Sequence, residues 1–475
     1  MWDWFLTAAW VGNLLCIPHL LLRNKRPTAT LAWLWAILLF PVIGAVLYLA
    51  IGSERVKRRR KERRQKFRAR GSLSSAREHA AKASTGVLQG IPPEGRAMLQ
   101  GLSTISRLPQ ATATSLQLLR KAPAFYAALR ESIEKAEHEV HVQSYVWRND
   151  EVGREFQDLL CQTARRGVKV RLLLDELGCY QLRDSYFNPL REAGGEFSWS
   201  HTLSPLRSRY AFNLRNHRKL QIIDGKIVFV GGMNFGREYL GRDPVLGDWG
   251  DVQLRVEGPV VELFRQVFAE DWFFAIGKAI PLRRHVHKHD LPDQSITQLL
   301  RGGPDEDDQP MLRSTLALIG AAQNRLWIST GYFVPGETLQ AALQVAAARG
   351  VDVRLLISGR SQHPILVKAG RSFYYAFLRQ GVRLFEYEKG IEHSKYMVID
   401  DDWAVIGSSN FDERSMRLNF ELSLLTHHRE TNRELAGIFE KTTGDAQEID
   451  LETFSQRPLS LRLMESSLRP LSPLL

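Results

Sequence analysis

The sequence predicts an α/β protein with two homologous lobes, each a mixed, mostly parallel sheet flanked by helices. We expect a pseudo-twofold axis to relate the lobes, and two N-terminal membrane helices to precede them. Three observations support this fold class. A strand–helix–glycine–strand pattern occurs twice, a His-x-Lys motif with matched downstream spacing occurs twice, and residues 29–51 are apolar without a single charge.

The repeated pattern predicts a βαβ unit in each half of the chain. An apolar strand is followed by a helix-like stretch, then by Arg-Gly-Val and a second apolar strand. The corresponding ranges are 139–147, 155–164 and 166–174 in the first half, and 325–330, 339–348 and 349–357 in the second. A strand, a crossover helix and a strand in this order indicate parallel pairing.

We divide the chain into four parts on this basis. Residues 1–54 hold the hydrophobic segments, and residues 55–110 hold a basic juxtamembrane tract followed by a linker with some helix. Residues 111–300 and 301–475 form the two lobes, each large enough to bury its own core. Residues 302–308, Gly-Gly-Pro-Asp-Glu-Asp-Asp, read as an exposed link between the lobes.

The second repeat is a constellation of polar residues with identical spacing. Four residues separate Lys from Asp, six separate Asp from Gly, and Gly-(Gly/Ser)-x-Asn closes the motif. The two copies are His217-Arg-Lys219, Asp224, Gly231-Gly232 and Asn234, and His393-Ser-Lys395, Asp400, Gly407-Ser408 and Asn410. A single His-x-Lys carries no information, but two copies with matched spacings indicate one site built from two halves.

Each copy predicts a β-hairpin. Apolar residues 220–223 and 396–399 follow the two His-x-Lys pairs, turn residues come next, and apolar residues 226–230 and 403–406 return. Residues two apart on a strand point to the same face, so we expect His and Lys to lie together on one arm of each hairpin.

These residue types suit attack on a phosphodiester. Lys219 and Lys395 can neutralise the non-bridging oxygens of the transition state, while Asn234 and Asn410 can donate hydrogen bonds to them. One neutral histidine can attack phosphorus and form a phosphohistidine, while the other, protonated, serves the leaving and incoming oxygens. We expect no cofactor and no metal, because the sequence has no cluster of ligands at metal-binding spacing and no phosphate-binding Gly-rich loop.

The duplicated motif resembles the signature of the phospholipase D superfamily, which it matches completely in both halves. Within it, the whole chain resembles the bacterial cardiolipin synthases, including residues 332–335, 419–421 and 472–475. The resemblance implies a phosphatidyltransferase that converts two phosphatidylglycerol molecules into cardiolipin and glycerol through a phosphohistidine. A membrane-bound phospholipase D or related phosphodiesterase is the alternative, and a non-catalytic scaffold for anionic lipid is a third hypothesis, disfavoured because both motif copies are intact.

The resemblance also implies roles for individual residues. The catalytic set is His217, Lys219, Asp224, His393, Lys395 and Asp400; Asn234 and Asn410 bind the substrate phosphate; and Asp251 and Glu421 orient histidines. We interpret Asp224 and Asp400 as structural, because each lies across a turn from its histidine. We predict a crossed arrangement in which Glu421 orients His217 and Asp251 orients His393. The two copies do not reveal which histidine attacks; we predict His217 as nucleophile and His393 as acid and base.

The N-terminus predicts a multi-pass membrane protein, and the family resemblance implies that the membrane is the bacterial inner membrane. Residues 29–51 are long enough to cross a bilayer. Residues 2–22 are mainly apolar but contain Asp3, Asn13, Pro18 and His19, so they either span or enter and return. A cleavable signal peptide does not fit, because no positive charge precedes the first segment and a second hydrophobic segment follows it.

The charge distribution favours membrane lipid over nucleic acid as a partner. Residues 55–70 carry a net charge of +10, out of +12 for the whole chain. A basic tract beside a membrane segment marks the cytoplasmic side and attracts anionic headgroups. We therefore expect the lobes in the cytoplasm and phosphatidylglycerol and other anionic membrane lipids as partners; the sequence does not indicate an oligomeric state.

Two further segments each leave two interpretations open. Residues 207–218 hold four arginines, Arg207, Arg209, Arg215 and Arg218, with Tyr210 and Phe212 among them, and form either a flexible polar loop or a loop that meets lipid phosphates. Residues 454–475 mix leucine with arginine and serine, and either lie on the membrane or cap the second lobe. The three scattered cysteines indicate neither a disulfide framework nor a metal site.

Overall fold

The computed structural model describes residues 16–22, 27–40, 42–49, 86–201, 214–242, 247–281, 294–306 and 308–472. Residues 1–63 and 203–213 form one unit, and residues 64–202 and 214–475 form a second unit that contains both lobes. The basic tract at residues 55–70 and the loop residues Arg207, Arg209, Tyr210 and Phe212 lie outside the described residues.

Among its described residues, the N-terminal unit contains a helical stretch at residues 16–21 and two short helices, α2 (Pro27–Leu39) and α3 (Ile43–Leu47). The membrane segment expected over residues 29–51 is therefore divided between two helices in the structure. The sequence holds Pro41, which lacks the N–H that a helix needs, and Val42 beyond it has a φ of 69°. Among the described residues, no helix has both the length and the apolar character needed to cross a membrane.

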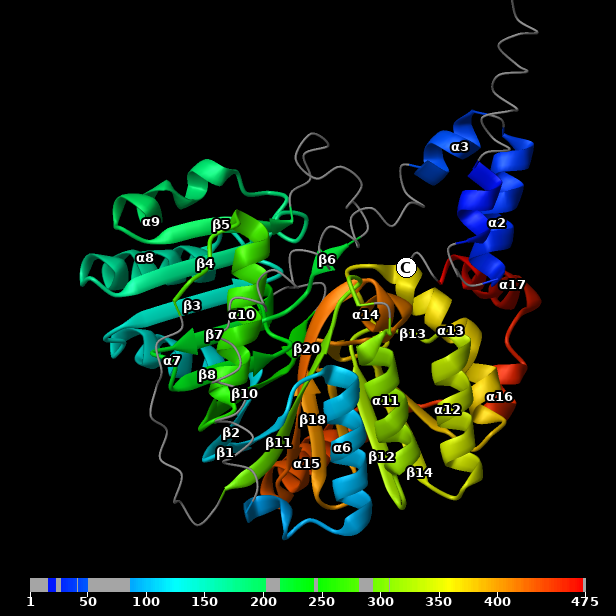
Figure 1. Ribbon diagram of the computed structural model, residues 1–475. Helices are drawn as coiled ribbons and strands as arrows, with labels where there is room; N and C mark the ends of the chain where they lie inside the picture. Colours follow the sequence, from blue (N-terminus) through cyan, green and yellow to red (C-terminus); the bar gives the residue numbers. More distant parts are fainter. Residues whose placement is uncertain are drawn as a thin grey trace, which may run out of the picture. The chain divides into compact units, whose positions relative to one another are not determined.

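The first lobe is built on a seven-stranded sheet with the order β2-β10-β8-β7-β3-β4-β5 (Figure 1). The strands are β2 (Ser115–Arg120), β3 (Glu139–Ser144), β4 (Lys169–Asp175), β5 (Glu196–His201), β7 (Leu220–Ile223), β8 (Ile227–Gly231) and β10 (Val252–Glu257).

The second lobe is built on a ten-stranded sheet with the order β1-β11-β20-β18-β17-β12-β14-β15-β21, and β6 (Arg215–Asn216) joins it through β20. Its other strands are β1 (Gln110–Ala113), β11 (Ser295–Gly302), β12 (Arg325–Thr330), β14 (Asp352–Ser358), β15 (Arg383–Tyr387), β17 (Tyr396–Ile399), β18 (Trp403–Gly407), β20 (Asn419–His427) and β21 (Gln447–Glu448). Two short parallel pairs complete the strands: β13 (Phe333–Val334) with β19 (Phe411–Asp412), and β9 (Asp248–Gly250) with β16 (Gly390–Glu392).

Helices cover the outer face of each sheet. Those of the first lobe are α7 (Lys121–Glu134), α8 (Glu151–Arg165) and α9 (Asn188–Glu192), and those of the second are α6 (Pro93–Ser106), α11 (Pro310–Ala321), α12 (Glu337–Ala348) and α13 (Pro364–Leu378). The remaining helices are α10 (Val261–Ile276), α14 (Glu413–Arg417), α15 (Arg429–Gly444), α16 (Leu451–Ser455), α17 (Leu459–Leu468) and the 3-10 turns η2 (Asp184–Phe187), η3 (Arg237–Leu240) and η4 (Arg469–Leu471).

The predicted βαβ units and hairpins are present in both lobes. β3 and β4 pair in parallel, as do β12 and β14, and the hairpins β7–β8 and β17–β18 are antiparallel. The expectation of mostly parallel sheets needs correction, because parallel order is limited in the two main sheets to β3-β4-β5, β12-β14-β15 and the short β6–β20 pair. The hairpins and the strands beyond them add antiparallel neighbours, for example β10 beside β8 and β18 beside β20.

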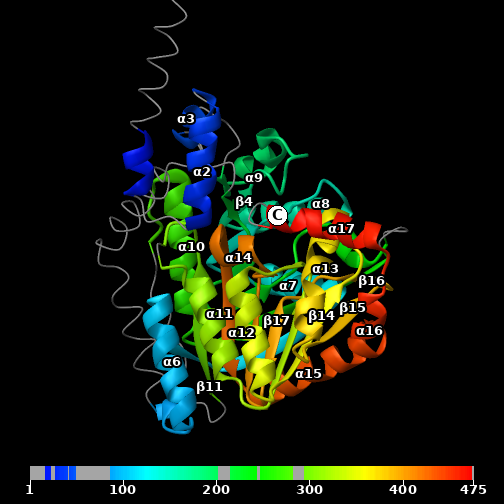
Figure 2. The same cartoon turned by 90° about the vertical axis from the view of Figure 1, so that its right-hand side faces the viewer.

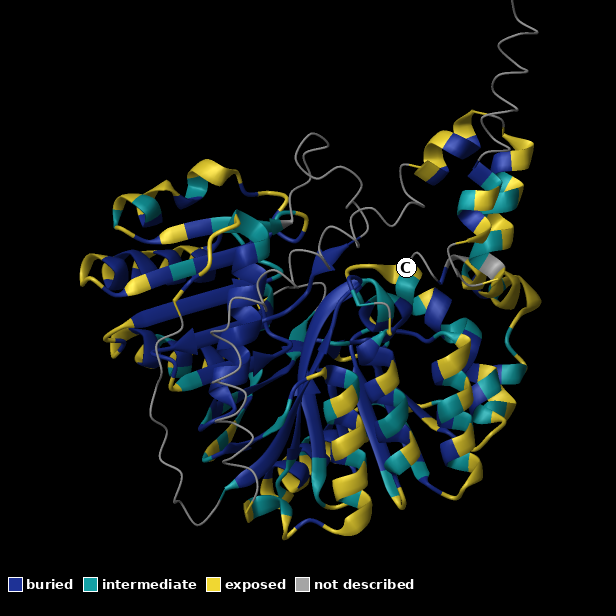
Figure 3. Ribbon diagram, viewed as in Figure 1, coloured by how far each residue is buried: buried dark blue, intermediate teal, exposed yellow. Residues whose placement is uncertain are grey.

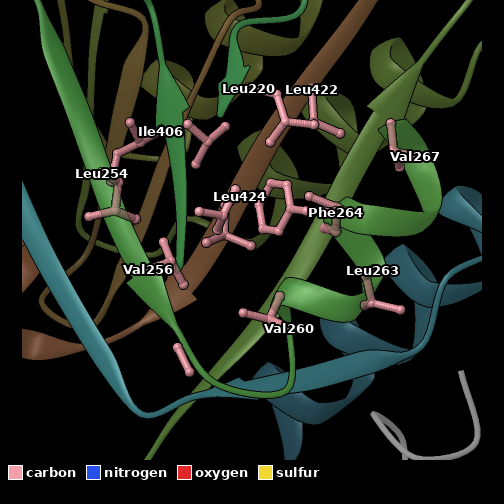
Figure 4. Packing of buried hydrophobic residues seen from close by; sticks show 14 of the residues in the cluster. Leu220, Leu254, Val256, Val260, Leu263, Phe264, Val267, Ile406, Leu422 and Leu424 are labelled. Carbon is pink, nitrogen blue, oxygen red and sulfur yellow. The ribbon is translucent and has the colours of Figure 1, made fainter. Parts of the chain in front are cut away.

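A shared hydrophobic core joins the two lobes. It combines Leu254 and Phe264 of the first lobe with Ile406, Leu422 and Leu424 of the second (Figure 4). α10 and α15 both contribute side chains to it. Because apolar surface from both sheets is buried in one layer, the lobes are held face to face with their hairpins on the same interface.

Three expected boundaries differ from the structure. The boundary expected between residues 300 and 301 falls inside β11, which pairs with β20 of the second lobe, and β1 pairs with β11. Part of the expected linker is core, since Leu99 and Leu102 of α6 are buried against the second lobe. The link expected to be exposed is buried at residues 302–305, because it connects β11 to α11 within the second lobe.

Candidate active site

The two His-x-Lys pairs lie in extended stretches just before their hairpins, not on the hairpin strands. Residues 217–219 connect β6 to β7, and residues 393–395 connect β16 to β17. His217, Lys219, His393 and Lys395 are all buried. The spacing rule still holds, because an extended backbone places residues two apart on the same side.

Asp224 and Asp400 hold the hairpin turns. Both have a positive φ, 51° and 49°, and the carboxylate of Asp224 accepts hydrogen bonds from the backbone N–H groups of residues 137, 138 and 139. Asp400 does the same for residues 323, 324 and 325. These contacts tie each turn to the start of β3 or β12, at the ends of the sheets away from the histidines, as expected for structural residues.

Short parallel strand pairs bring each histidine to a carboxylate of the opposite lobe. β6 pairs with the start of β20, with Asn216 beside Phe420, so the next residues along are His217 and Glu421. β16 pairs with β9, with Glu392 beside Gly250, so the next residues are His393 and Asp251. The register of two-residue and three-residue strands therefore produces the crossed arrangement that the sequence predicted.

Glu421 makes several hydrogen bonds besides its contact with His217. Nδ1 of His217 lies 3.0 Å from Oε1 and 3.1 Å from Oε2 of Glu421. The Ser408 hydroxyl donates to Oε2 at 2.5 Å, and the Asn419 amide donates to Oε1 at 3.3 Å. Donors around a buried carboxylate stabilise its ionised form.

Asp251 has fewer donors. Its Oδ2 lies 2.8 Å from Nδ1 of His393, and its Oδ1 accepts the N–H of Val252 at 2.8 Å. Gly232 occupies the place that Ser408 takes in the other half, and a Cβ there would lie 2.3 Å from Oδ1 of Asp251. Glycine therefore makes room for the carboxylate but provides no hydroxyl.

The two carboxylates consequently differ in acidity. Burial raises the pKa of Asp251 to about 7, although Lys395 and the Val252 N–H oppose this shift. Burial also acts to raise the pKa of Glu421, but His217, Lys219 and the Ser408 hydroxyl outweigh it and the pKa is lowered. At neutral pH Glu421 is ionised, whereas the carboxyl group of Asp251 is still partly protonated.

Both histidines and both lysines have lowered pKa values. Burial lowers the pKa of His217, although the negative charge of Glu421 opposes this shift. The pKa of His393 is lowered well below its usual value by burial and by the positive charges of Lys395, Lys219 and His217. Burial brings the pKa of Lys219 to about 7 and that of Lys395 to about 8. The mutual influence of these groups across the two lobes shows that they share one buried cluster.

Each lysine is held by the histidine of its own motif. Lys219 Nζ donates to the carbonyl oxygen of His217 at 2.8 Å, and Lys395 Nζ donates to the carbonyl oxygen of His393. Lys219 Nζ also lies 5.3 Å from the ring centroid of Tyr145, at cation–π distance. The ammonium groups are thus fixed beside the imidazoles in both halves.

The two asparagines are not equivalent. Asn234 Oδ1 accepts from the Val146 N–H and the Ser144 hydroxyl, and its Nδ2 donates to Tyr239. A contact of Asn234 with a substrate phosphate would use its second Nδ2 hydrogen. Asn410 Oδ1 is buried without a hydrogen-bond partner.

Sequence reasoning missed the aromatic wall of the site. The ring of Tyr145 lies 5.0 Å from that of His217, edge to face. Tyr239, Trp249 and Tyr332 surround His393, with ring centroids 5.4 to 6.2 Å away. Tyr145 directly follows β3, at the edge of the sheet where the parallel strands end. Because ligands commonly bind at this edge, its position in the sequence could have indicated a role in the site.

Sequence reasoning also missed the role of Arg218, the middle residue of the first motif. Its guanidinium donates to both oxygens of Asp271 at 2.7 Å, to the carbonyl of Gly302 at 3.0 Å and to the carbonyl of Glu421 at 3.2 Å. Arg215 and Arg218 are both buried within the protein. For these two arginines, the expectations of a flexible polar loop and of a lipid-contacting loop are therefore both wrong. Arg218 instead connects the lobes next to Glu421.

The comparison with protein families agrees with the geometry of this site. The family model "Cardiolipin synthase, PLD-like domain" matches residues 129–272 and 315–443, and the model "Phospholipase_D-nuclease N-terminal" matches residues 11–53.

Curated relatives match along almost the whole chain. Cardiolipin synthase of Geobacillus sp. (strain WCH70) is 37% identical over 461 residues, which is 96% of this chain and 90% of the relative. Cardiolipin synthase 1 of Bacillus cereus is 32% identical and covers 99% of this chain and 94% of its own length. The crystal structure of phosphatidylserine synthase from Haemophilus influenzae Rd KW20 covers 80% of this chain and all of its own, with a TM-score of 0.61 and 16% identity, which supports the fold alone. This chain belongs to the cardiolipin synthase family of phospholipase D-like proteins.

Proposed function

We propose that the enzyme transfers a phosphatidyl group between two phosphatidylglycerol molecules and releases cardiolipin and glycerol. The observation that carries the proposal is the pair of crossed histidine–carboxylate contacts, with two lysines, in one buried cluster of a cardiolipin synthase family member. The reaction exchanges one phosphodiester for another, so it is near energetic balance and needs no nucleotide.

In the first half-reaction, His217 is the nucleophile. Ionised Glu421 accepts a hydrogen bond from the N–H at Nδ1 of His217. This bond fixes the tautomer in which Nε2 carries the free lone pair. Nε2 attacks phosphorus as the bond from phosphorus to the glycerol oxygen breaks. The product is a phosphatidyl-histidine.

His393 serves as acid and then as base. The Asp251–His393 pair titrates as one unit, and because the pKa of Asp251 is about 7 whereas that of Glu421 is lowered, below about pH 7 this pair carries one proton more than the Glu421–His217 pair. Nε2–H of His393 protonates the leaving glycerol oxygen. His393 then takes the proton from the hydroxyl of the second phosphatidylglycerol, whose oxygen attacks phosphorus as the bond to His217 breaks.

The remaining motif residues stabilise charge. Lys219 and Lys395 neutralise the non-bridging oxygens as negative charge grows on them, and the amides of Asn234 and Asn410 donate to the same oxygens. Each step proposed here is assigned to a side chain of this protein. Among the described residues, no three His, Cys, Asp or Glu side chains are grouped to hold a metal ion.

We further propose that the N-terminal unit holds the enzyme at the bacterial inner membrane, with the lobes on the cytoplasmic side. The support is twofold: α2 and the residues around α3 expose many large apolar side chains, and the basic tract at residues 55–70 follows them. Phosphatidylglycerol and other anionic lipids are then the partners.

The products formed from phosphatidylglycerol test the proposed reaction. Purified full-length enzyme incubated with phosphatidylglycerol vesicles should form cardiolipin and free glycerol in equal amounts, as measured by lipid chromatography and a glycerol assay. Phosphatidic acid as the main product would instead identify a phospholipase D, because water would then have resolved the intermediate.

The same assay run with a chelator tests the side-chain mechanism. We expect an unchanged rate with EDTA, since each step above uses residues of this chain. A rate that falls with EDTA and recovers with a divalent cation would contradict the mechanism.

The pH profile should reveal the two buried lysines. Both phosphate-neutralising lysines must be protonated, and their pKa values are about 7 and about 8. As pH rises through this range the ammonium groups lose their protons, so kcat/KM should begin to fall above about pH 7, roughly three units below the pKa of an ordinary lysine. The measurement is kcat/KM against pH on a short-chain, water-soluble phosphatidylglycerol.

Arginine variants provide the control for this profile. Lys219→Arg and Lys395→Arg keep a positive charge at all these pH values. Whatever the loss of rate from altered geometry, the alkaline fall should become less steep in at least one variant, and it should still begin near pH 7, because the Asp251–His393 pair must also be protonated. An alkaline fall of unchanged steepness in both variants would assign it to groups other than the lysines.

A further inference from the structure

We propose that α13 and α17 form a docking face for an anionic bilayer beside the active site. We define this α13–α17 face by its exposed residues Ile365, Lys368, Leu459, Arg462, Leu463 and Met464. The inference rests on the proposed function, because the substrates are membrane lipids.

The first observation is a concentration of apolar side chains. In the described part of residues 86–472, eight large hydrophobic side chains are exposed, and five of them lie on α13 or α17. Leu459 is 67% exposed, Leu463 61% and Met464 38%, all on one ten-residue helix. Figure 3 shows that α17 is exposed along most of its length. Isolated surface leucines need no explanation, whereas a cluster marks a contact surface.

The second observation is the charge of this surface. α13 contains no acidic residue, and Glu465, the acid of α17, faces inward at 1% exposure and pairs with Arg457 at 2.9 Å. The exposed charges on these helices are therefore cationic, and include Lys368 and Arg462. Apolar side chains flanked by cations, without acids, match the surface of an anionic bilayer.

Another surface helix of the same lobe provides the contrast. α15 exposes Arg429, Glu430, Arg433, Glu434 and Glu440, a mixture of both signs without a large apolar side chain. This is the composition expected of a helix that faces water. The α13–α17 face is thus a local feature and not the general character of the lobe.

The third observation is continuity with the active site. The rings of His393 and Tyr332 lie 6.2 Å apart, and those of Tyr332 and His363, the residue that caps α13, lie 6.5 Å apart. One turn into α13, Lys368 Nζ lies 3.9 Å from the sulfur of Met464 on α17. A short path of neighbouring side chains therefore joins this face to His393.

The position of the helices agrees with this path. In two views at right angles, α17 lies at the same end of the lobes as α14, whose N-terminal residue Glu413 follows the second motif and β19 (Figures 1 and 2). The expectation that the C-terminal stretch caps the second lobe is confirmed for Phe454 and Glu465, which are buried. Leu459 and Leu463 face outward, and the expectation that this stretch lies on the membrane stays a prediction.

A fluorescent probe tests the docking face directly. The three native cysteines are buried, so an environment-sensitive dye can be attached to Leu463→Cys in the full-length protein in phosphatidylglycerol vesicles. The matched control is Val345→Cys on α12, an apolar residue of similar exposure at 58%. We expect emission at 463 to shift to the blue and to be quenched by lipids with a quencher on the acyl chain, and emission at 345 to show neither.

Two outcomes would overturn the proposal. In one, the probe at 463 behaves like the probe at 345, and the face is exposed to water. In the other, emission of the probe at 463 shifts to the blue but is not quenched by the labelled lipid. The face would then be covered by protein, either the N-terminal unit or a second copy of the chain.

A kinetic experiment separates this proposal from the proposed function. Leu459→Glu with Leu463→Glu should lower the rate on phosphatidylglycerol vesicles roughly tenfold, because it replaces apolar docking residues by acids. The rate on monomeric short-chain phosphatidylglycerol should be unchanged, and Val345→Glu should change neither rate. Equal rates for the double variant and Val345→Glu on vesicles would refute the docking face, whereas a wild-type protein that converts neither substrate would refute the proposed function.

Discussion

Replacing His217 or His393 by alanine should lower the rate of cardiolipin formation by roughly 10⁴-fold or more, the loss seen when a nucleophile or its acid–base partner is removed. Each imidazole has a partner from the opposite lobe, Glu421 or Asp251, at 2.8 to 3.1 Å. Neither role can be taken over by the other histidine, because each ring is fixed by its own carboxylate. The measurement is the initial rate of cardiolipin formation from phosphatidylglycerol.

A substrate with a better leaving group should distinguish the two roles. The phosphatidyl ester of p-nitrophenol needs no protonation of its leaving oxygen, so the first half-reaction no longer depends on the acid. His393→Ala should release a burst of nitrophenol equal to the enzyme concentration and retain a phosphatidyl group on His217. His217→Ala should give no burst, and a burst from that variant with phosphate on His393 would reverse the assignment.

His427→Ala is the control for these variants. His427 ends β20, where its ring packs against Trp403, and it is not part of the site. We expect this variant to keep the wild-type rate and to give no burst beyond wild type. A loss of activity in His427→Ala similar to that in His217→Ala would mean that the assay reports folding instead of chemistry.

The sequence predicts the hairpins well because their signals are local. β7 and β17 have the bounds expected from their apolar runs, and Asp224 and Asp400 mark the turns through short-range geometry. The crossed pairs of His217 with Glu421 and of His393 with Asp251 were predictable only through the resemblance to a family. The strand pairings that produce them extend over only two or three residues and cross between the lobes, so no periodicity marks them.

The errors have a common physical origin in tertiary packing. Residues 302–305 have the composition of an exposed turn, but they are buried and the Gly302 carbonyl accepts a hydrogen bond from Arg218. α6 lies in a segment rich in small residues, and its burial depends on α11 and β11, which are some 200 residues away in sequence. The break after Leu39 is different, because Pro41 is a local signal that hydropathy alone overlooks.

Replacing Asp271 by leucine should lower the free energy of unfolding of the lobes by about 3–5 kcal/mol, the cost of leaving one member of a buried ion pair without its partner. Asp271 accepts from the Arg218 guanidinium at 2.7 Å, and both side chains are almost completely buried. The amides of Gln143 and Asn216 also donate to Asp271. The measurement is urea unfolding of the full-length protein followed by tryptophan fluorescence.

Two comparisons decide whether this loss comes from the ion pair. Glu448→Gln breaks the exposed pair with Arg383 and should cost less than about 1 kcal/mol. Arg218→Met combined with Asp271→Leu removes both buried charges, and it should recover most of the stability that Asp271→Leu loses, because a buried pair replaced by apolar groups is often neutral.

Activity should not recover with stability in the double variant, because Arg218 also donates to the carbonyl of Glu421 and so positions the residue beside His217. Recovery of both stability and full activity would show that Arg218 holds the lobes together without positioning Glu421.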